Sequence, residues 1–183
     1  MIQIIDNYFD RLKNTIDNIN KEEIINFVGI LIKARENGKQ IFIMGNGGSA
    51  STASHFACDI NKGVNKGDKR FKVICLNDNI PTMLAYANDI GYNDIFKEQL
   101  RNFIKLDDIV IGISGSGNSE NILNAMEFAS YMGAITVGIT GFDGGKLKKI
   151  SDLSVNANVN DMQISEDIHM ILDHLITNYF QEQ

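Results

Sequence analysis

The chain reads IGISGSGNSEN over residues 111–121. An apolar, strand-like segment from Asp108 to Ile113 leads into this stretch, and a helix-like pattern continues from it to Met132. Its glycines and three serines therefore lie where a strand ends and a helix begins. Serine hydroxyls and exposed backbone N–H groups, beside the partial positive charge of a helix N-terminus, can hold a phosphate without lysine or arginine. The stretch thus predicts a phosphate-binding turn, and the alternative is an ordinary flexible turn between strand and helix.

A second glycine-rich turn, GNGGS at 45–49, follows another short apolar strand. From residue 40 onward expected strands alternate with expected helices. The strands are 41–44, 71–76, 108–113, 134–140 and an edge strand at 153–155; the helices are 50–61, a short one capped by Asn79, 93–103, one ending near 132, and 161–181, with a turn at 141–145. This order predicts a three-layer α/β/α sandwich around a parallel sheet, with ligands at the carboxyl ends of its strands. Both glycine-serine turns fall at such ends, so we expect them to share one pocket.

Two helices are expected before the sheet, within residues 1–38. The first, over 3–19, carries apolar residues at helical spacing, namely Ile5, Phe9, Leu12, Ile16 and Ile19. Asn20 and Glu23 have the spacing of a capping box for the second helix, which Gly38 can end. Neither helix has a strand partner, so both can pack on their own domain or on a neighbouring subunit. We expect one domain over 1–183, with the α/β core and closing helix at 39–183.

Composition narrows the class of protein further. The chain has 183 residues and a net charge of −6, which suits one α/β domain and gives no overall basic field for nucleic acid. A short basic cluster, interpretable as a solvated loop or as steering for an anion, comprises Lys62, Lys66, Lys69, Arg70 and Lys72. No signal peptide or membrane-length apolar run is expected. Cys58 and Cys75 lack metal spacing, and we expect reduced, buried thiols in a cytoplasmic protein.

The sequence lacks the common nucleotide and hydrolase motifs. Neither glycine turn fits G-x-G-x-x-G, and the glycine turn at 141–146 is one residue short of a P-loop, with Leu147 where Ser or Thr is needed. A G-x-S-x-G elbow is absent as well. These observations disfavour dinucleotide binding and nucleotide hydrolysis, and favour a small phosphorylated metabolite.

The histidines are few, and each could be an ordinary half-buried side chain. His55 and Asp59 are four residues apart on one helix face, where they could hold a metal or form a structural hydrogen bond. In the last helix Glu166 shares a face with His169, but lies eight residues, about 12 Å along the axis, from His174. One ion or small substrate cannot easily reach both Glu166 and His174 from one straight helix. If both are functional, either subunits share the site or the helix begins later than expected.

Five segments, in order and over nearly the whole length, resemble the sugar isomerase (SIS) domain family, most closely its phosphoheptose isomerases. They are GNGGS at 45–49, HFA at 55–57, AND at 87–89 with NDIF at 93–96, GISGSGNS at 112–119, and TGFDGGK at 140–146. The resemblance implies a flavodoxin-like sandwich, a homotetramer with active sites at subunit boundaries, and a cytoplasmic aldose–ketose isomerase. Such an enzyme converts D-sedoheptulose 7-phosphate to D-glycero-D-manno-heptose 7-phosphate, the first step towards heptose for lipopolysaccharide or capsule.

The resemblance also implies roles for particular residues. Phosphate would be held by Ser49, Ser114, Ser116 and Ser119. The sugar would be lined by Asn46, Gly47, Gly48, Asn88 and Asp89, together with Glu166. Zinc would be bound by His55, Asp59, Glu166 and His174, of which Asp59 and His174 would form the acid/base pair. Asp59, Glu166 and Gly115 stand where the family usually has Glu, Gln and Thr, which leaves the metal and the sugar length open.

Three alternative functions are compatible with the same motifs. One is a non-enzymatic relative that binds a replication-initiator protein, but the presence of both Asp59 and His174 favours an enzyme. A second is a phosphosugar-binding regulatory module, which usually accompanies a further domain for which this chain has no room. The third is an isomerase of another ketose phosphate.

Overall fold

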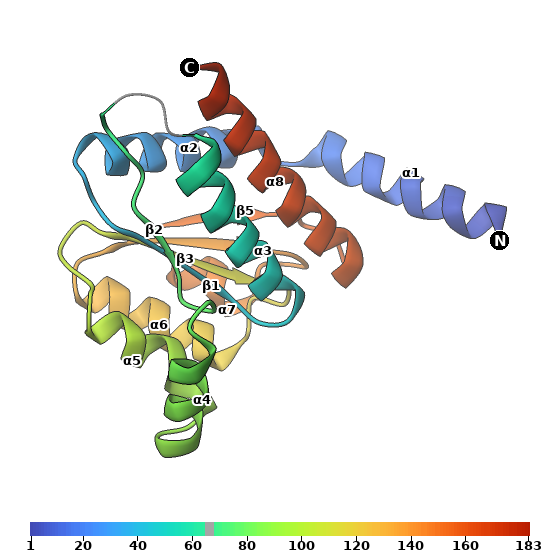
Figure 1. Cartoon of the computed structure of the whole chain (residues 1–183). Helices are drawn as coiled ribbons and strands as arrows, with labels where there is room; N and C mark the ends of the chain where they lie inside the picture. Colours follow the sequence, from blue (N-terminus) through green and yellow to red (C-terminus); the bar gives the residue numbers. More distant parts are fainter. Residues whose placement is uncertain (65–67) are drawn as a thin grey trace.

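Five apolar segments form a parallel sheet in the order β2-β1-β3-β4-β5 (Figure 1). They are β1 (Ile41–Gly45), β2 (Val73–Cys75), β3 (Ile109–Ser114), β4 (Ile135–Thr140) and β5 (Leu153–Asn156). The structure is a computed structural model that describes residues 1–64 and 68–183. Every residue of β1 and β3 is buried, as expected for central parallel strands covered on both faces.

Helices cover both faces of this sheet, which confirms the three-layer sandwich (Figure 1). On one face lie α2 (Lys21–Glu36), α3 (Gly48–Cys58) and α8 (Met162–Glu182), and on the other α5 (Ile95–Arg101), α6 (Glu120–Tyr131) and α7 (Gly145–Ile150). Phe27 of α2 stacks on Phe56 of α3 in the first layer of the core, with ring centroids 6.3 Å apart. Phe42 and Phe96, both fully buried, belong to the second layer.

The strand order changes direction between β1 and β3, and this fixes where a ligand can bind. The chain leaves β1 for β2 on one side and returns to β3 on the other, so a crevice opens at their carboxyl ends. Gly45 makes the turn into α3 possible, because a Cβ there would lie 2.5 Å from the backbone carbonyl of Ser49. The two glycine-serine turns therefore meet at one edge of the sheet, as expected.

Helix α1 (Ile2–Asn18) projects from the sandwich beside α8 (Figure 1). It is attached through the Tyr8 hydroxyl, which donates to Asp167 Oδ2 at 2.7 Å, and through an ion pair between Arg11 and Asp161. Its apolar side chains Ile2, Ile4, Ile5, Phe9 and Ile16 remain exposed. The first helix is thus confirmed, and its apolar face is largely uncovered within one chain.

A second projecting element is α4 (Ile80–Asp89), in which every residue is at least partly exposed. The Asn79 side chain accepts a hydrogen bond from the Thr82 N–H, which confirms the expected cap. The Asn20 cap is confirmed too, although its side chain accepts from the Glu22 N–H and Glu23 bonds the Asn20 amide rather than its backbone.

Several local expectations were wrong. The helix expected at 50–61 is α3 followed by a π-helical turn, η1 (Asp59–Gly63), and the helix expected at 93–103 is a 3-10 turn, η2 (Tyr92–Asp94), followed by α5. The strand expected at 71–76 is three residues long, and the turn at 141–145 leads into the unexpected α7. Cys58 is exposed at the end of α3, whereas Cys75, inside the sheet, is buried.

Two further sequence expectations concern charge and membranes. Lys69 of the basic cluster pairs with Glu36 and Lys72 donates to the Gly38 carbonyl, while Lys66 lies outside the described residues. Of the helices that the structure describes, none has both the length and the apolar character to cross a bilayer.

His169 is buried in α8, with 1% of its surface exposed, and neither ring nitrogen makes a hydrogen bond of normal geometry within the described chain. Burial lowers the pKa of His169, so the folded protein holds this ring neutral. The unfolded chain takes up a proton near pH 6.5, so we expect folding stability to fall as the pH drops below that value. Urea unfolding should show that the free energy of unfolding changes less between pH 7.5 and pH 5 in His169→Leu than in the wild type. An equal change in both proteins would contradict the neutral state of His169 in the folded protein.

Candidate active site

A hollow of about 320 Å³ lies at the carboxyl ends of β1 and β3. The residues that line it are Asn46, Gly47, Gly48, Ser49, Ile113, Ser114, Gly115, Ser116, Ser119, Met162 and Glu166. The structure therefore brings together the residues expected to bind phosphate and sugar, apart from Asn88 and Asp89. The shared pocket expected from the two turns is present.

Hydroxyl groups and helix N-termini give this hollow its chemistry. The Ser114 and Ser119 hydroxyl oxygens are 3.1 Å apart, and the Asn118 N–H donates to Ser116 Oγ at 3.2 Å. Ser119 is the N-cap of α6 but makes no side-chain capping bond, so its hydroxyl can serve a ligand. Ser49 lies in the first turn of α3. Both helix dipoles place positive potential at the hollow, which favours an anion.

Asn46 is held in place by two residues that the sequence reasoning missed. Its side-chain amide exchanges hydrogen bonds with that of Asn121, at 2.8 and 2.9 Å. The Tyr92 hydroxyl also donates to Asn46 Oδ1, at 2.8 Å. Asn121 belongs to the stretch 111–121 that predicts the phosphate-binding turn, whereas no sequence pattern marks Tyr92.

Two glycines make room for large side chains over the hollow. A Cβ on Gly48 would lie 2.3 Å from Glu166 Oε1, so the Glu166 carboxylate sits against the N-terminus of α3. A Cβ on Gly115 would lie 2.5 Å from Met162 Sδ. Met162 thus occupies the space that a threonine side chain, usual at position 115 in the family, would need. Glycine at position 115 therefore goes together with Met162 in this chain.

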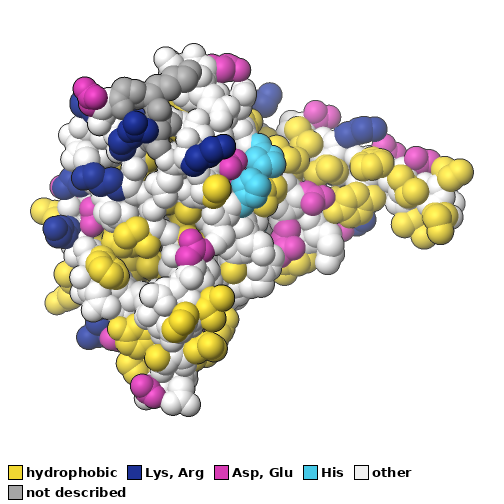
Figure 2. All heavy atoms as spheres, in the orientation of Figure 1, with side chains coloured by type: hydrophobic (Ala, Val, Ile, Leu, Met, Phe, Trp, Pro, Cys, Tyr) yellow, Lys and Arg dark blue, Asp and Glu magenta, His cyan; other side chains and the backbone are white. Residues whose placement is uncertain are grey.

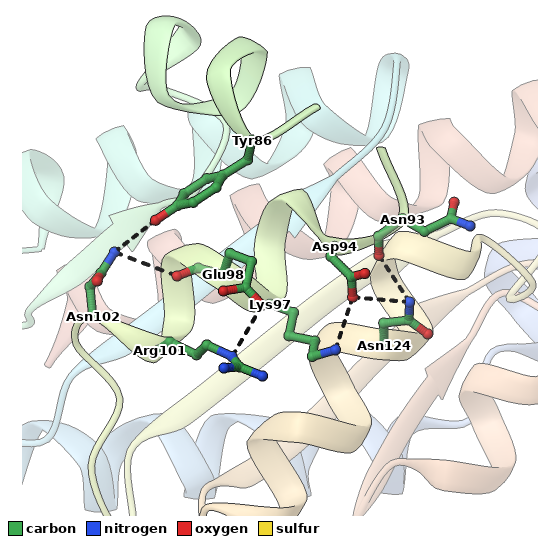
Figure 3. A network of polar contacts seen from close by, with 8 residues as sticks. All are labelled: Tyr86, Asn93, Asp94, Lys97, Glu98, Arg101, Asn102 and Asn124. Atoms are coloured by element: carbon green, nitrogen blue, oxygen red, sulfur yellow. Dashed lines mark hydrogen bonds and ion pairs between the residues drawn. The ribbon is translucent and has the colours of Figure 1, made fainter. Parts of the chain in front are cut away.

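Asn88 and Asp89 lie elsewhere, at the exposed end of α4, where the Asn88 amide donates to Asp89 Oδ1 at 2.7 Å. The segment after α4 is fastened to the sandwich by polar contacts (Figure 3). Asn124 of α6 donates to the Asn93 carbonyl at 3.0 Å, and Lys97 pairs with Asp94 at 3.0 Å. The NDIF segment therefore anchors the base of α4 and makes no direct contact with the hollow.

A second cluster unites His55, Asp59, Asp173 and His174, which each offer a ligand atom within 4.8 Å of the others. His55 Nε2 is 3.4 Å from Asp59 Oδ2 and 3.3 Å from His174 Nε2. The two histidines are exposed, and they form one cyan patch in Figure 2. Asp59 begins the π-helical turn η1, a type of helix defect that is frequent at functional sites.

Asp173 is the buried member of this cluster, with 1% of its surface exposed. Burial raises the pKa of its carboxyl to about 7, and the nearby charge of Asp59 acts in the same direction. The Thr177 hydroxyl opposes this shift only weakly, because no hydrogen bond of normal geometry joins the two within the described residues. Imidazole nitrogens and carboxylate oxygens are donors that suit zinc, so the cluster fits a divalent metal ion.

The hollow and the cluster lie at two ends of the same pair of helices. Gly48 of α3 faces Glu166 of α8, and seven or eight residues further on His55 faces His174, so the helices run parallel. The separation is about 10–12 Å along the axes. Because α8 runs without a break from Met162 to Glu182, a late helix start does not bring Glu166 to His174. Within one chain Glu166 belongs to the hollow.

This chain is similar to known proteins along most of its length. The SIS domain profile matches residues 7–141, and the chain belongs to the SIS domain family. Its relatives include phosphoheptose isomerases. That of Helicobacter pylori strain P12 is 35% identical over 167 residues, which cover 91% of this chain and 86% of the relative. A probable phosphoheptose isomerase of Thermoplasma acidophilum is 33% identical over 166 residues, 91% of each chain.

Solved structures agree on the fold. The phosphoheptose isomerase of Neisseria gonorrhoeae superposes with a TM-score of 0.91 at 24% identity, over 99% of this chain and 98% of that one. The phosphoheptose isomerase of Francisella tularensis gives a TM-score of 0.88 at 26% identity, over 100% and 98%. The expected flavodoxin-like SIS fold is confirmed.

Proposed function

We propose that this chain is an aldose–ketose isomerase that interconverts D-sedoheptulose 7-phosphate and D-glycero-D-manno-heptose 7-phosphate. The hydroxyl-lined hollow between two helix N-termini carries the proposal, since it suits a phosphorylated sugar. The relatives' name, phosphoheptose isomerase, supports the same substrate. The test supplies the ketose phosphate to the purified protein and couples product formation to the kinase that acts on it. No product would overturn the proposal.

The hollow would hold the phosphate through Ser49, Ser114, Ser116 and Ser119, each of which can turn a hydroxyl towards an anion. Asn46, Gly47, Gly48 and Glu166 would then contact the sugar. Glu166, as a carboxylate, accepts hydrogen bonds only, so it suits sugar hydroxyls better than phosphate oxygens. Asn88 and Asp89 lie outside the hollow of their own chain, and we assign them to a site completed by a second subunit.

The reaction moves one proton between two carbons. A base removes the proton from C1 of the ketose, an enediol forms, and the same proton returns to C2 of the aldose. A second group transfers a proton between the two oxygens. We assign Asp59 as the carbon base and His174 as its partner, with the opposite order as the alternative, because a carboxylate and an imidazole can each be tuned towards neutral pH.

A zinc ion is supported by the same cluster, whose donor atoms are already close together. His55, Asp59 and His174 would be among its ligands. When bound, zinc would polarise a carbonyl or organise sugar hydroxyls.

We further propose a homotetramer with sites at subunit boundaries. The uncovered apolar face of α1 supports association, since exposed apolar patches mark contact surfaces. The 10–12 Å between hollow and cluster is a second reason, because a neighbouring subunit can bring its own cluster to this hollow. The cytoplasmic location and the place at the first step of heptose precursor synthesis stay predictions.

Replacing Ser116 by alanine is expected to raise KM by roughly 10-fold or more and to leave kcat nearly unchanged. A hydrogen bond to a charged group contributes about 1.5–3 kcal/mol, and the phosphate is far from the reacting carbons. The matched control is Ser130→Ala, at an exposed position of α6, which should keep the wild-type KM. An unchanged KM in Ser116→Ala would contradict the phosphate assignment.

A further inference from the structure

We propose that Asp173 is a ligand of a divalent metal site in this chain. The other ligands are His55, Asp59 and His174. This inference rests on the proposed function, which places a metal at the cluster. Resemblance to the family puts the fourth ligand at Glu166 and gives Asp173 no role.

Within one chain, geometry favours Asp173 over Glu166. The four ligand atoms of the cluster lie within 4.8 Å of one another, and donor atoms around a four-coordinate zinc ion lie about 3–3.5 Å apart when each bond is about 2.0–2.2 Å. Small side-chain movements would therefore close the set. The Glu166 carboxylate of the same chain lies against Gly48, about 12 Å along α8 from His174, so Asp173 and not Glu166 lies beside the other three ligands within one chain.

The surroundings of Asp173 supply an independent argument. Neither carboxylate oxygen has a hydrogen-bond partner among residues 1–64 and 68–183, although the side chain is 1% exposed. Buried carboxylates in proteins are paired, hydrogen-bonded or bound to a metal. The charged groups that act on this carboxyl are Asp59, of the same sign, and His55. A bound cation is the partner that this carboxylate lacks.

Charge balance and access complete the argument. Two carboxylates and two neutral imidazoles together neutralise one divalent ion. Half of the His55 side chain is exposed, as is His174, so an ion can enter from solvent while Asp173 binds it from below. Nitrogen and oxygen donors of this kind suit Zn²⁺ or Co²⁺ better than the all-oxygen preference of Mg²⁺ or Ca²⁺.

The test measures metal binding by the full-length protein without sugar. Chelator-treated wild type, Asp173→Asn and Glu166→Gln compete for Zn²⁺ with a chromophoric chelator, and Co²⁺ absorption spectra report the ligand set. The two variants are matched, since each replaces one α8 carboxylate by an amide of equal size. We expect Glu166→Gln to keep the wild-type affinity. Asp173→Asn should bind Zn²⁺ at least 100-fold more weakly, because loss of a ligand exceeds the 10–100-fold cost of losing an outer contact.

Thermal unfolding separates a ligand from a residue that only supports the fold. Metal-free Asp173→Asn should melt no lower than the metal-free wild type, because it loses a buried, unpartnered carboxylate. Added Zn²⁺ should raise the Tm of the wild type and of Glu166→Gln, but not that of Asp173→Asn.

Two results would overturn the proposal: full Zn²⁺ affinity in Asp173→Asn, or a wild type that binds neither Zn²⁺ nor Co²⁺. Because sugar is absent, these results do not depend on whether the chain is an isomerase. A protein that binds Zn²⁺ through Asp173 but forms no heptose phosphate would overturn the proposed function alone.

Discussion

His174→Ala is expected to lower isomerase turnover by about 10²–10⁴-fold, because the variant loses one of the two proton-transfer groups. His174 stands on the exposed side of α8 next to His55 and contributes nothing to the buried core. The oligomer and its thermal stability in the absence of metal should therefore stay as in the wild type. The coupled assay measures kcat, and size-exclusion chromatography with light scattering measures the assembly.

Asn178→Ala is the matched control for His174→Ala. Asn178 is exposed one turn further along α8, and within the part of the chain that the structure describes its side chain bonds only Glu182. The Asn178→Ala protein should turn over normally.

Mixing His174→Ala with a Ser114→Ala/Ser116→Ala double variant tests whether subunits share active sites. If hollow and cluster come from different subunits, re-formed oligomers regain activity. Normal turnover of His174→Ala alone would refute its catalytic role.

Gly117→Ala is expected to lower the free energy of unfolding by about 2–6 kcal/mol and to disable phosphate binding. Gly117 has φ +64°, in the left-handed region, and a Cβ there would lie 2.0 Å from the Gly144 carbonyl oxygen. The strain of that conformation and the backbone overlap each cost about 1–3 kcal/mol. The Gly117 carbonyl also accepts from the Leu147 N–H at 2.9 Å, so relief by movement would separate two loops at the hollow.

Gly29→Ala provides the matched control, because Gly29 lies inside α2 without a positive φ, and, apart from the backbone of α2 itself, no atom of residues 1–64 or 68–183 lies within 4 Å of an added Cβ. Its unfolding free energy should rise by about 0.5–1 kcal/mol, since alanine favours helix more than glycine does. Denaturant unfolding measures both variants. A Gly117→Ala protein as stable as the wild type would show that the two loops do not need their close approach.

Local patterns were enough to predict the sheet, the two glycine-serine turns and the hollow they form. Each depends on a strand-to-helix transition that residues 45–49 and 111–121 mark by themselves. The cap at Asn79 was predictable for the same reason. Helix α7 was missed because it is short and begins with two glycines of positive φ, the N-cap Gly144 and the first helical residue Gly145.

Which side chains meet across helices could not be read from spacing alone. The distance between Glu166 and His174 followed from helix geometry, but their different neighbours depend on how α8 packs against α3. Asp173 interrupts an apolar pattern without any local sign of a partner, and only the approach of His55 and Asp59 gives it one. Cys58 looked buried because its helix is apolar, yet it lies on the outward side.

The parallel course of α3 and α8 restricts how this protein can change over evolution. One added residue between Ser49 and His55 would swing the histidine by roughly 100° around its helix and advance it by about 1.5 Å. The end of α3 that lines the hollow would stay in place, while His55 would lose its contact with His174. Insertions or deletions in this stretch of α3 are therefore tolerable only with a compensating change in α8. The two segments should thus change together during evolution.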